Sequence, residues 1–123
     1  MSQTLDTRGT NDPRVYRDSA LTNVAVGITS ATNLSGWNII NTNSSDVYVK
    51  FYDVSSGSVT VGTTTAVKTI AVPANTTVYL AHNAAQTQYY FSTAMSFACV
   101  TGIADTSTTA PATAIYIEIF FNP

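Results

Sequence analysis

The segment DVYVKFYD, residues 46–53, decides the fold class, because bulky apolar residues occupy every second position in it. Successive side chains of a β-strand point to opposite faces, so Val47, Val49 and Phe51 share one face. The closing segment IYIEIFF, residues 115–121, repeats the pattern with Ile and Phe on one side. Both segments therefore predict strands that bury one face in a core.

Similar short segments recur along the chain, separated by clusters of Gly, Asn, Ser and Pro that favour turns. No segment keeps the helical period of 3.6 residues over three turns. The pattern predicts an all-β fold, an antiparallel β-sandwich, with the jelly roll as one candidate arrangement. We expect strands at residues 24–28, 37–40, 47–52, 66–72, 76–80, 89–91, 95–101 and 114–121, and consider a short one at 58–61. The expected core comprises Val47, Val49, Phe51, Met95, Phe97, Cys99, Ile115, Ile117, Ile119 and Phe121.

The 123 residues support one domain, and their composition is notable for its lack of charge. Hydrophobic residues make up 45% of the chain but charged residues only 10%, against roughly 25% in an ordinary soluble domain. A weakly charged surface suits a subunit that copies or partners cover. The net charge of −2 and the lack of a basic run argue against nucleic-acid binding. We expect no secretion signal and no membrane span, because no apolar run is long enough.

Charges gather at the beginning of the chain. Of the five basic and seven acidic residues, six lie before residue 19, including all three arginines, Arg8, Arg14 and Arg17. Because this stretch lacks an apolar period, we expect residues 1–18 to form an extended N-terminal arm and residues 19–123 to form the sandwich. Arginine binds carboxylates bidentately, so the three arginines are candidates for charged anchoring contacts with a partner. The alternative is a frayed tail.

The faces opposite the expected core are rich in aromatic residues. Each carries one charge between two aromatic residues: Tyr48, Lys50 and Tyr52 on one strand, and Tyr116, Glu118 and Phe120 on the other. Exposed aromatic patches often mark contact surfaces. We therefore expect another subunit to cover these faces at least in part, with Lys50 and Glu118 paired within or between chains, because an unpaired buried charge is costly. Two solvated faces are the alternative.

Reactive side chains are few. His82 and Cys99 are the only histidine and cysteine, so neither a His cluster nor a Cys pair can hold a metal within one chain. Cys99 falls on an apolar strand face and is expected to be an inert buried thiol, and three copies of His82 on a trimer axis are an open alternative. Asp46 and Asp53 are expected to be turn residues that bond nearby backbone, and Asp105 is expected to have a turn role too, with a metal site as the alternative. We expect no enzyme activity and no cofactor, because no nucleotide-binding or hydrolase motif occurs.

Three stretches together resemble small virion proteins of tailed bacteriophages: YVKFYDVSSGSVTVGTTTAVKTIAVPANTTVYL (48–80), YYFSTAMSFACVTGIADTSTTAP (89–111) and IYIEIFF (115–121). The resemblance covers roughly residues 37–121 and leaves out the arm. It implies a structural role on the virion surface, as a capsid decoration (cement) protein that binds the major capsid protein. We expect a homo-oligomer, a trimer at threefold positions. The alternatives are a tail or head–tail component, and a carbohydrate-binding module on the virion that uses Trp37 and the tyrosines.

Overall fold

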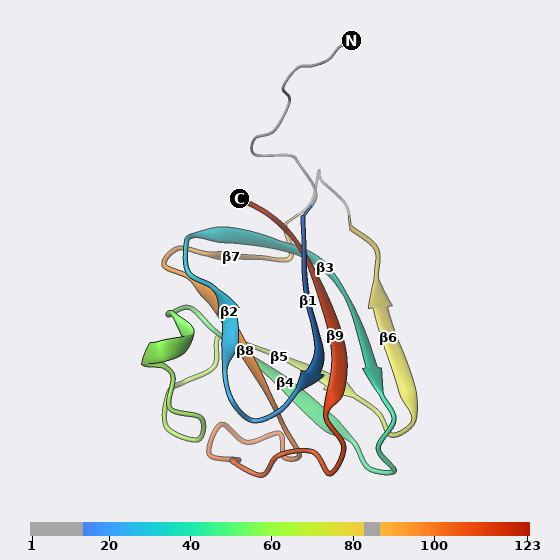
Figure 1. The fold of residues 1–123 in the computed structure, drawn as a ribbon. Coiled ribbons are helices and arrows are strands. Elements are labelled where there is room, and N and C mark those ends of the chain that lie inside the picture. Colours follow the sequence, from blue (N-terminus) through green and yellow to red (C-terminus); the bar gives the residue numbers. More distant parts are fainter. Residues whose placement is uncertain (1–13, 83–86) are drawn as a thin grey trace.

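Two antiparallel sheets pack face to face in the computed structural model, which describes residues 14–82 and 87–123 (Figure 1). The strands are β1 (Arg14–Leu21), β2 (Val26–Ile28), β3 (Thr32–Asn41), β4 (Val47–Tyr52), β5 (Lys68–Val72), β6 (Thr76–Leu80), β7 (Tyr89–Phe91), β8 (Met95–Val100) and β9 (Ile115–Asn122). Sheet A has the order β1-β9-β3-β6, with β7 also paired to β3, and sheet B has the order β2-β8-β4-β5. The predicted all-β antiparallel sandwich is confirmed.

Most strands form close to their expected places, and β4, β6 and β7 have the expected bounds. β3 is longer than the expected strand at 37–40, because Ser35 and Gly36 lie at a bulge within the strand and do not end it. Glycine is required there, since a Cβ atom on Gly36 would clash with the Leu80 carbonyl oxygen. The strand considered at 58–61 does not form; a 3₁₀ turn, η1 (Ser56–Ser58), and a tight turn with a positive φ at Gly62 lie in that region.

The sandwich begins earlier in the chain than the sequence indicates. β1 pairs antiparallel with β9 from residue 14 onward, so residues 14–18 belong to sheet A and not to the expected arm. Tyr16 points inward and packs edge-on against Phe97, with ring centroids 5.5 Å apart. The remaining part of the expected arm, including Arg8, lies outside the described residues.

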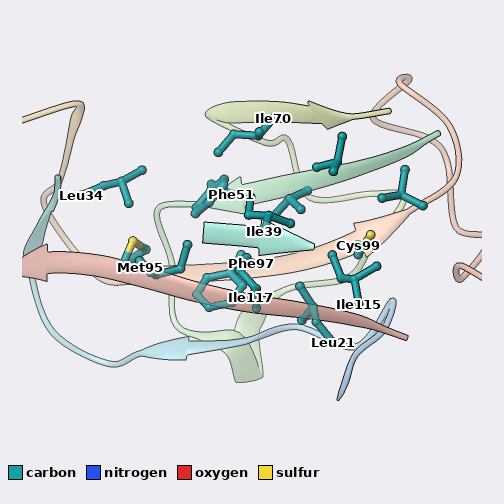
Figure 2. Packing of buried hydrophobic residues seen from close by; sticks show 14 of the residues in the cluster. Leu21, Leu34, Ile39, Phe51, Ile70, Met95, Phe97, Cys99, Ile115 and Ile117 are labelled. Atoms are coloured by element: carbon teal, nitrogen blue, oxygen red, sulfur yellow. The ribbon is translucent and has the colours of Figure 1, made fainter. Parts of the chain in front are cut away.

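The core lies between the two sheets and contains nine of the ten expected side chains, among them the labelled Phe51, Phe97 and Ile117 in Figure 2. It also contains residues that the sequence analysis did not name, such as Leu21, Leu34 and Ile39. Phe121 is the exception, because it is only partly buried and packs against the edge of the cluster. The Phe51 ring lies 5.6 Å from Phe97 and 6.2 Å from Phe91, centroid to centroid. Since these inward residues are fixed, the residues between them on β4 and β9 must point outward.

Two buried asparagines, Asn41 and Asn43, hold one end of the sandwich together. The Asn41 amide donates to three backbone carbonyl oxygens at 3.0–3.1 Å, and its Oδ1 accepts from the backbone and the side chain of Asn43. Asn43 Oδ1 accepts from the Thr113 backbone N–H at 2.7 Å, and Asn43 Nδ2 donates to the Thr113 carbonyl at 2.9 Å. The segment that precedes β9 is thereby tied to the turn after β3.

Asp46 and Asp53 bond the backbone of turns, but the expectation that this backbone lies nearby in sequence is wrong. Asp46 accepts the N–H of Ala74 at 3.0 Å, and Asp53 accepts three consecutive N–H groups at residues 92–94. Burial alone would raise the pKa of Asp53, but these hydrogen bonds together hold it below its usual value. Asp53 therefore fixes the turn between β7 and β8.

Candidate interaction surface

The outer face of sheet A brings together residues from four strands that are far apart in sequence. Directly opposed residues of antiparallel strands point the same way, so the pairing register defines one row across the sheet. In this row Arg17 of β1 lies beside Glu118 of β9, which lies beside Asn38 of β3, which lies beside Tyr79 of β6. Figure 1 shows these four strands side by side.

Hydrogen bonds join the polar members of this row, with Tyr116 linking Arg17 to Glu118 and Asn38 bonding Glu118 directly. Arg17 Nε donates to the Tyr116 hydroxyl at 3.0 Å, and that hydroxyl donates to Glu118 Oε2 at 2.8 Å. Asn38 Nδ2 donates to the other Glu118 oxygen at 3.1 Å. The Arg17 guanidinium also lies over the Tyr116 ring, 5.1 Å from its centroid. We call Arg17, Asn38, Tyr116 and Glu118 the polar strip.

The hydrogen bonds of the polar strip shift the pKa values of its two charged residues, Arg17 and Glu118. The hydrogen bond to Tyr116, and after it the bond from Asn38, lowers the pKa of Glu118. The hydrogen bond to the Tyr116 hydroxyl raises the pKa of Arg17. Both charged forms are therefore favoured, although both side chains remain in contact with water.

Apolar side chains surround the polar strip and remain open. Val15, Tyr79 and Tyr90 lie on this face with 57%, 65% and 56% of their surface exposed. Phe120 packs edge-on against Tyr79, with ring centroids 6.3 Å apart. It also lies over Gly36, where a side chain would meet the Phe120 ring. The outer face of sheet A is thus a broad surface of exposed aromatic and aliphatic groups around ordered polar ones.

The part of the outer face of sheet B that lies over β4 and β8 is covered by the chain itself, while the outward residues of the edge strand β5 are exposed. Lys50 and Tyr52 are each only 2% exposed, and their neighbours on β8, Ser96, Ala98 and Val100, are fully buried. The Lys50 ammonium donates to the Ile103 carbonyl oxygen and lies 3.6 Å from the half-exposed Asp105 carboxylate. Residues 101–114, between β8 and β9, therefore lie over this face.

A second segment, between β4 and β5, completes the cover. The Ser96 hydroxyl donates to the Val54 carbonyl at 2.8 Å, which holds the beginning of this segment against β8. The two covering segments also touch, since a Cβ atom on Gly62 would clash with the Thr108 side chain. Asn23, just before β2, donates from Nδ2 to the Thr108 carbonyl at 2.9 Å, and this bond holds the segment 101–114 near its contact with Gly62.

These contacts correct two expectations from the sequence. The charge that faces Lys50 is Asp105, and Glu118 cannot reach Lys50 within the chain, because the two residues lie on opposite outer faces of the sandwich. Lys50 and Tyr52 are covered by their own chain and offer no surface to another subunit, while Tyr48 is half-buried. Tyr116, Glu118 and Phe120 lie together on the open face, and Arg17, expected in the arm, joins them there.

The reactive residues are held in structural roles. Burial raises the pKa of the Cys99 thiol to about 12, so it is a poor nucleophile. His82 Nδ1 lies 2.6 Å from the hydroxyl of Ser35, which is buried and also donates to the Phe120 carbonyl. Within the described residues, no group of three His, Cys, Asp or Glu side chains is placed to bind a metal ion. Over the same residues, no helix is long and apolar enough to span a membrane.

No protein-family model matches the sequence, and neither a curated protein nor a solved structure is significantly similar to it. The surface therefore has to be interpreted from its own geometry. Sequence reasoning missed Val15, Asn38, Tyr79 and Tyr90 as members of the open face. Their place depends on the pairing of β1, β6 and β7 with distant strands, which no local pattern reveals.

Proposed function

We propose that the protein is a non-enzymatic structural protein of a tailed-phage virion, a capsid decoration protein that binds the outside of the assembled shell as an oligomer. The observation that carries this proposal is the open outer face of sheet A, with Val15, Tyr79 and Tyr90 exposed around the polar strip. Extended apolar surface of this kind marks an interaction site more often than a free surface.

Several features support a shell contact at this face. The polar strip offers a cation and an anion whose positions are fixed before binding, which lowers the entropy lost on docking. The chain as a whole carries little charge, with 10% charged residues, as suits a subunit that neighbours cover. Contacts of modest strength per chain add up when several linked copies bind one shell.

The strand order supports a jelly roll as the specific form of the sandwich. β1 pairs with β9, β2 with β8, β3 with β6, and β4 with β5. Apart from β7, the first four strands thus pair with the last four in reverse order, as in one long hairpin wrapped around itself. Double-sheet jelly rolls are a common architecture of viral capsid domains, and this agrees with the proposed location.

The resemblance to phage virion proteins and the position of the arginines point to the same partner. Arg17 lies in the polar strip, and Arg14 is the first residue of β1, the strand that carries Arg17 and Val15 on the open face. We propose that this face, together with the residues that precede it, contacts the major capsid protein.

The test uses capsid shells of a tailed phage that encodes this chain, and the shells are assembled in the absence of this protein. Purified protein is added, and bound copies per shell are counted after sedimentation. We expect saturable binding at many copies per shell, lost in Val15→Glu, because the new charge would be buried in the contact. Ile103→Glu is the matched control, since Ile103 is 69% exposed on the segment over sheet B, and it should bind as the unchanged protein does.

Other outcomes of this experiment overturn the proposal. Equal binding by the Val15→Glu and Ile103→Glu variants would remove sheet A from the contact. A few copies at one vertex or on the tail would assign the protein to a tail or head–tail position. Binding of a neutral polysaccharide without shell binding, lost on Tyr79→Ala or Tyr90→Ala, would make it a carbohydrate-binding module, because these two exposed rings could stack on sugars.

A further inference from the structure

We propose that β6 is an interface between copies of this chain, in which two β6 strands pair antiparallel across a two-fold axis. Among residues 14–82 and 87–123, the strand lies at one edge of sheet A and pairs with β3 alone (Figure 1). An unpaired edge presents a row of free N–H and C=O groups, which is a template for pairing with another strand. This inference does not depend on the shell contact proposed above, although Tyr79 belongs to both surfaces.

The other edge strands that the structure describes carry features that prevent such pairing. β1 has a bulge between Asp18 and Leu21 and three charged residues along its length. β2 and β7 have only three residues each. β5 begins with Lys68 and is followed by Pro73. Charges, bulges, prolines and short length are the usual protections of sheet edges.

β6 has none of these protections. Its five residues, TTVYL, include no charge and no proline, and its pairing with β3 is regular from Thr76 to Leu80. The core-facing Val78 and Leu80 are only partly buried, whereas the core-facing residues of the central strand β9, from Ile115 to Ile119, are fully buried. A strand added outside β6 would cover these side chains.

The sequence of β6 is suited to pairing with itself. Full overlap of two antiparallel copies places the two-fold axis at Val78, so the two Val78 side chains face each other on the core side. On the outer side, Thr77 of each copy then faces Tyr79 of the other. β-branched and aromatic residues are favourable cross-strand neighbours, and no like charges meet. A second copy of this chain is therefore the partner that fits the edge.

This pairing would join two copies of sheet A into one continuous sheet. The two open faces would then form a single surface, with Tyr79 of each copy at the centre. A two-fold contact produces dimers or other even-numbered assemblies, whereas the resemblance led us to expect a trimer. The mass of the free protein therefore distinguishes the two arrangements.

Sedimentation equilibrium of the full chain tests the pairing. We expect a reversible dimer. The double variant Thr77→Lys, Tyr79→Lys should weaken dimerisation by about tenfold or more, because lysines would oppose lysines at both outer positions. The matched variant Thr77→Glu, Tyr79→Lys changes the same two exposed positions but places opposite charges across the axis, so it should dimerise within about threefold of the unchanged chain.

Several outcomes would overturn the inference. A monomer or a trimer of the unchanged chain would do so, and so would equal dimerisation of the two charged variants. Val15→Glu, on the opposite edge of sheet A, should leave the dimer intact. Loss of the dimer in that variant would instead place the contact on the open face, against the inference.

Discussion

The outward residues of β4 and β9 follow nearly the same sequence pattern, but the first are mostly buried and the second remain open to solvent. β4 presents Tyr, Lys and Tyr at alternate positions, and β9 presents Tyr, Glu and Phe. The β4 face is closed, because the chain's own segments cover it and Lys50 is bound beneath them. The β9 face is open, because no described segment folds over it and its polar groups bond within the plane of the face.

This difference shows what alternation in a strand determines and what it leaves undetermined. Alternation sets the direction in which each side chain points. Whether an outward side chain meets water, a loop or a partner depends on the connections between strands. β4 lies between β5 and β8, and the long connections at residues 53–67 and 101–114 adjoin these strands, while β9 lies between β1 and β3, which are followed by the short connections 22–25 and 42–46.

The largest effect should come from removing the Lys50 side chain, which binds the covering segment 101–114 to the closed face. Lys50→Ala deletes a buried side chain and leaves the Ile103 carbonyl without its donor, so we expect it to lower the free energy of unfolding by about 2–4 kcal/mol. Urea unfolding measures this. Glu118→Ala, the matched change on the open face, should hardly move the unfolding midpoint, because water can replace the lost contacts. Similar losses for the two variants would contradict the distinction between the faces.

A smaller effect is expected where the covering segment is tied to the end of the sandwich. Asn43→Ala removes both hydrogen bonds to Thr113 and the link to Asn41, so the free energy of unfolding should fall by about 1–3 kcal/mol. Asn33→Ala, at a half-exposed position on sheet A, should change it by less than about 0.5 kcal/mol. The same unfolding experiment checks both. An equally small loss for Asn43→Ala would mean that the cover is held elsewhere.

Much of the fold could be predicted from the sequence, because strand alternation is a local signal. Val47, Val49 and Phe51 are buried as that signal predicts, and β4 has the expected bounds. The errors arise where pairing between distant residues decides the outcome. β1 looks like a charged tail until its pairing with β9 is known, and Lys50 has no visible partner until residues 101–114 fold over it.

The smallest effect concerns the acidity of Glu118 on the open face. Its pKa lies below the usual value mainly because Tyr116 donates to it, so Tyr116→Phe should raise that pKa toward the ordinary value for Glu. Because the pKa of Glu118 is lower in the folded than in the unfolded chain, its ionised form stabilises the folded state at pH values above the unfolded pKa. This stabilisation is lost as the pH falls through the folded pKa, so an effect of Tyr116→Phe on stability is expected only in acid. NMR titration of the Glu118 carboxyl carbon measures the shift. Tyr48→Phe, on the closed face, is the control and should leave the pKa of Glu118 unchanged.

The most direct measurement of the central claim is hydroxyl-radical footprinting of the free protein and of the protein bound to shells. In the free protein we expect Tyr79 and Val15 to be modified and Tyr52 to be protected, because the first two are exposed and the last is buried. On the shell, Val15 and Phe120 should become protected while Ile103, on the segment over sheet B, stays reactive. If Val15 and Phe120 react equally in both states, or if Ile103 alone becomes protected, the open face of sheet A is not the contact surface.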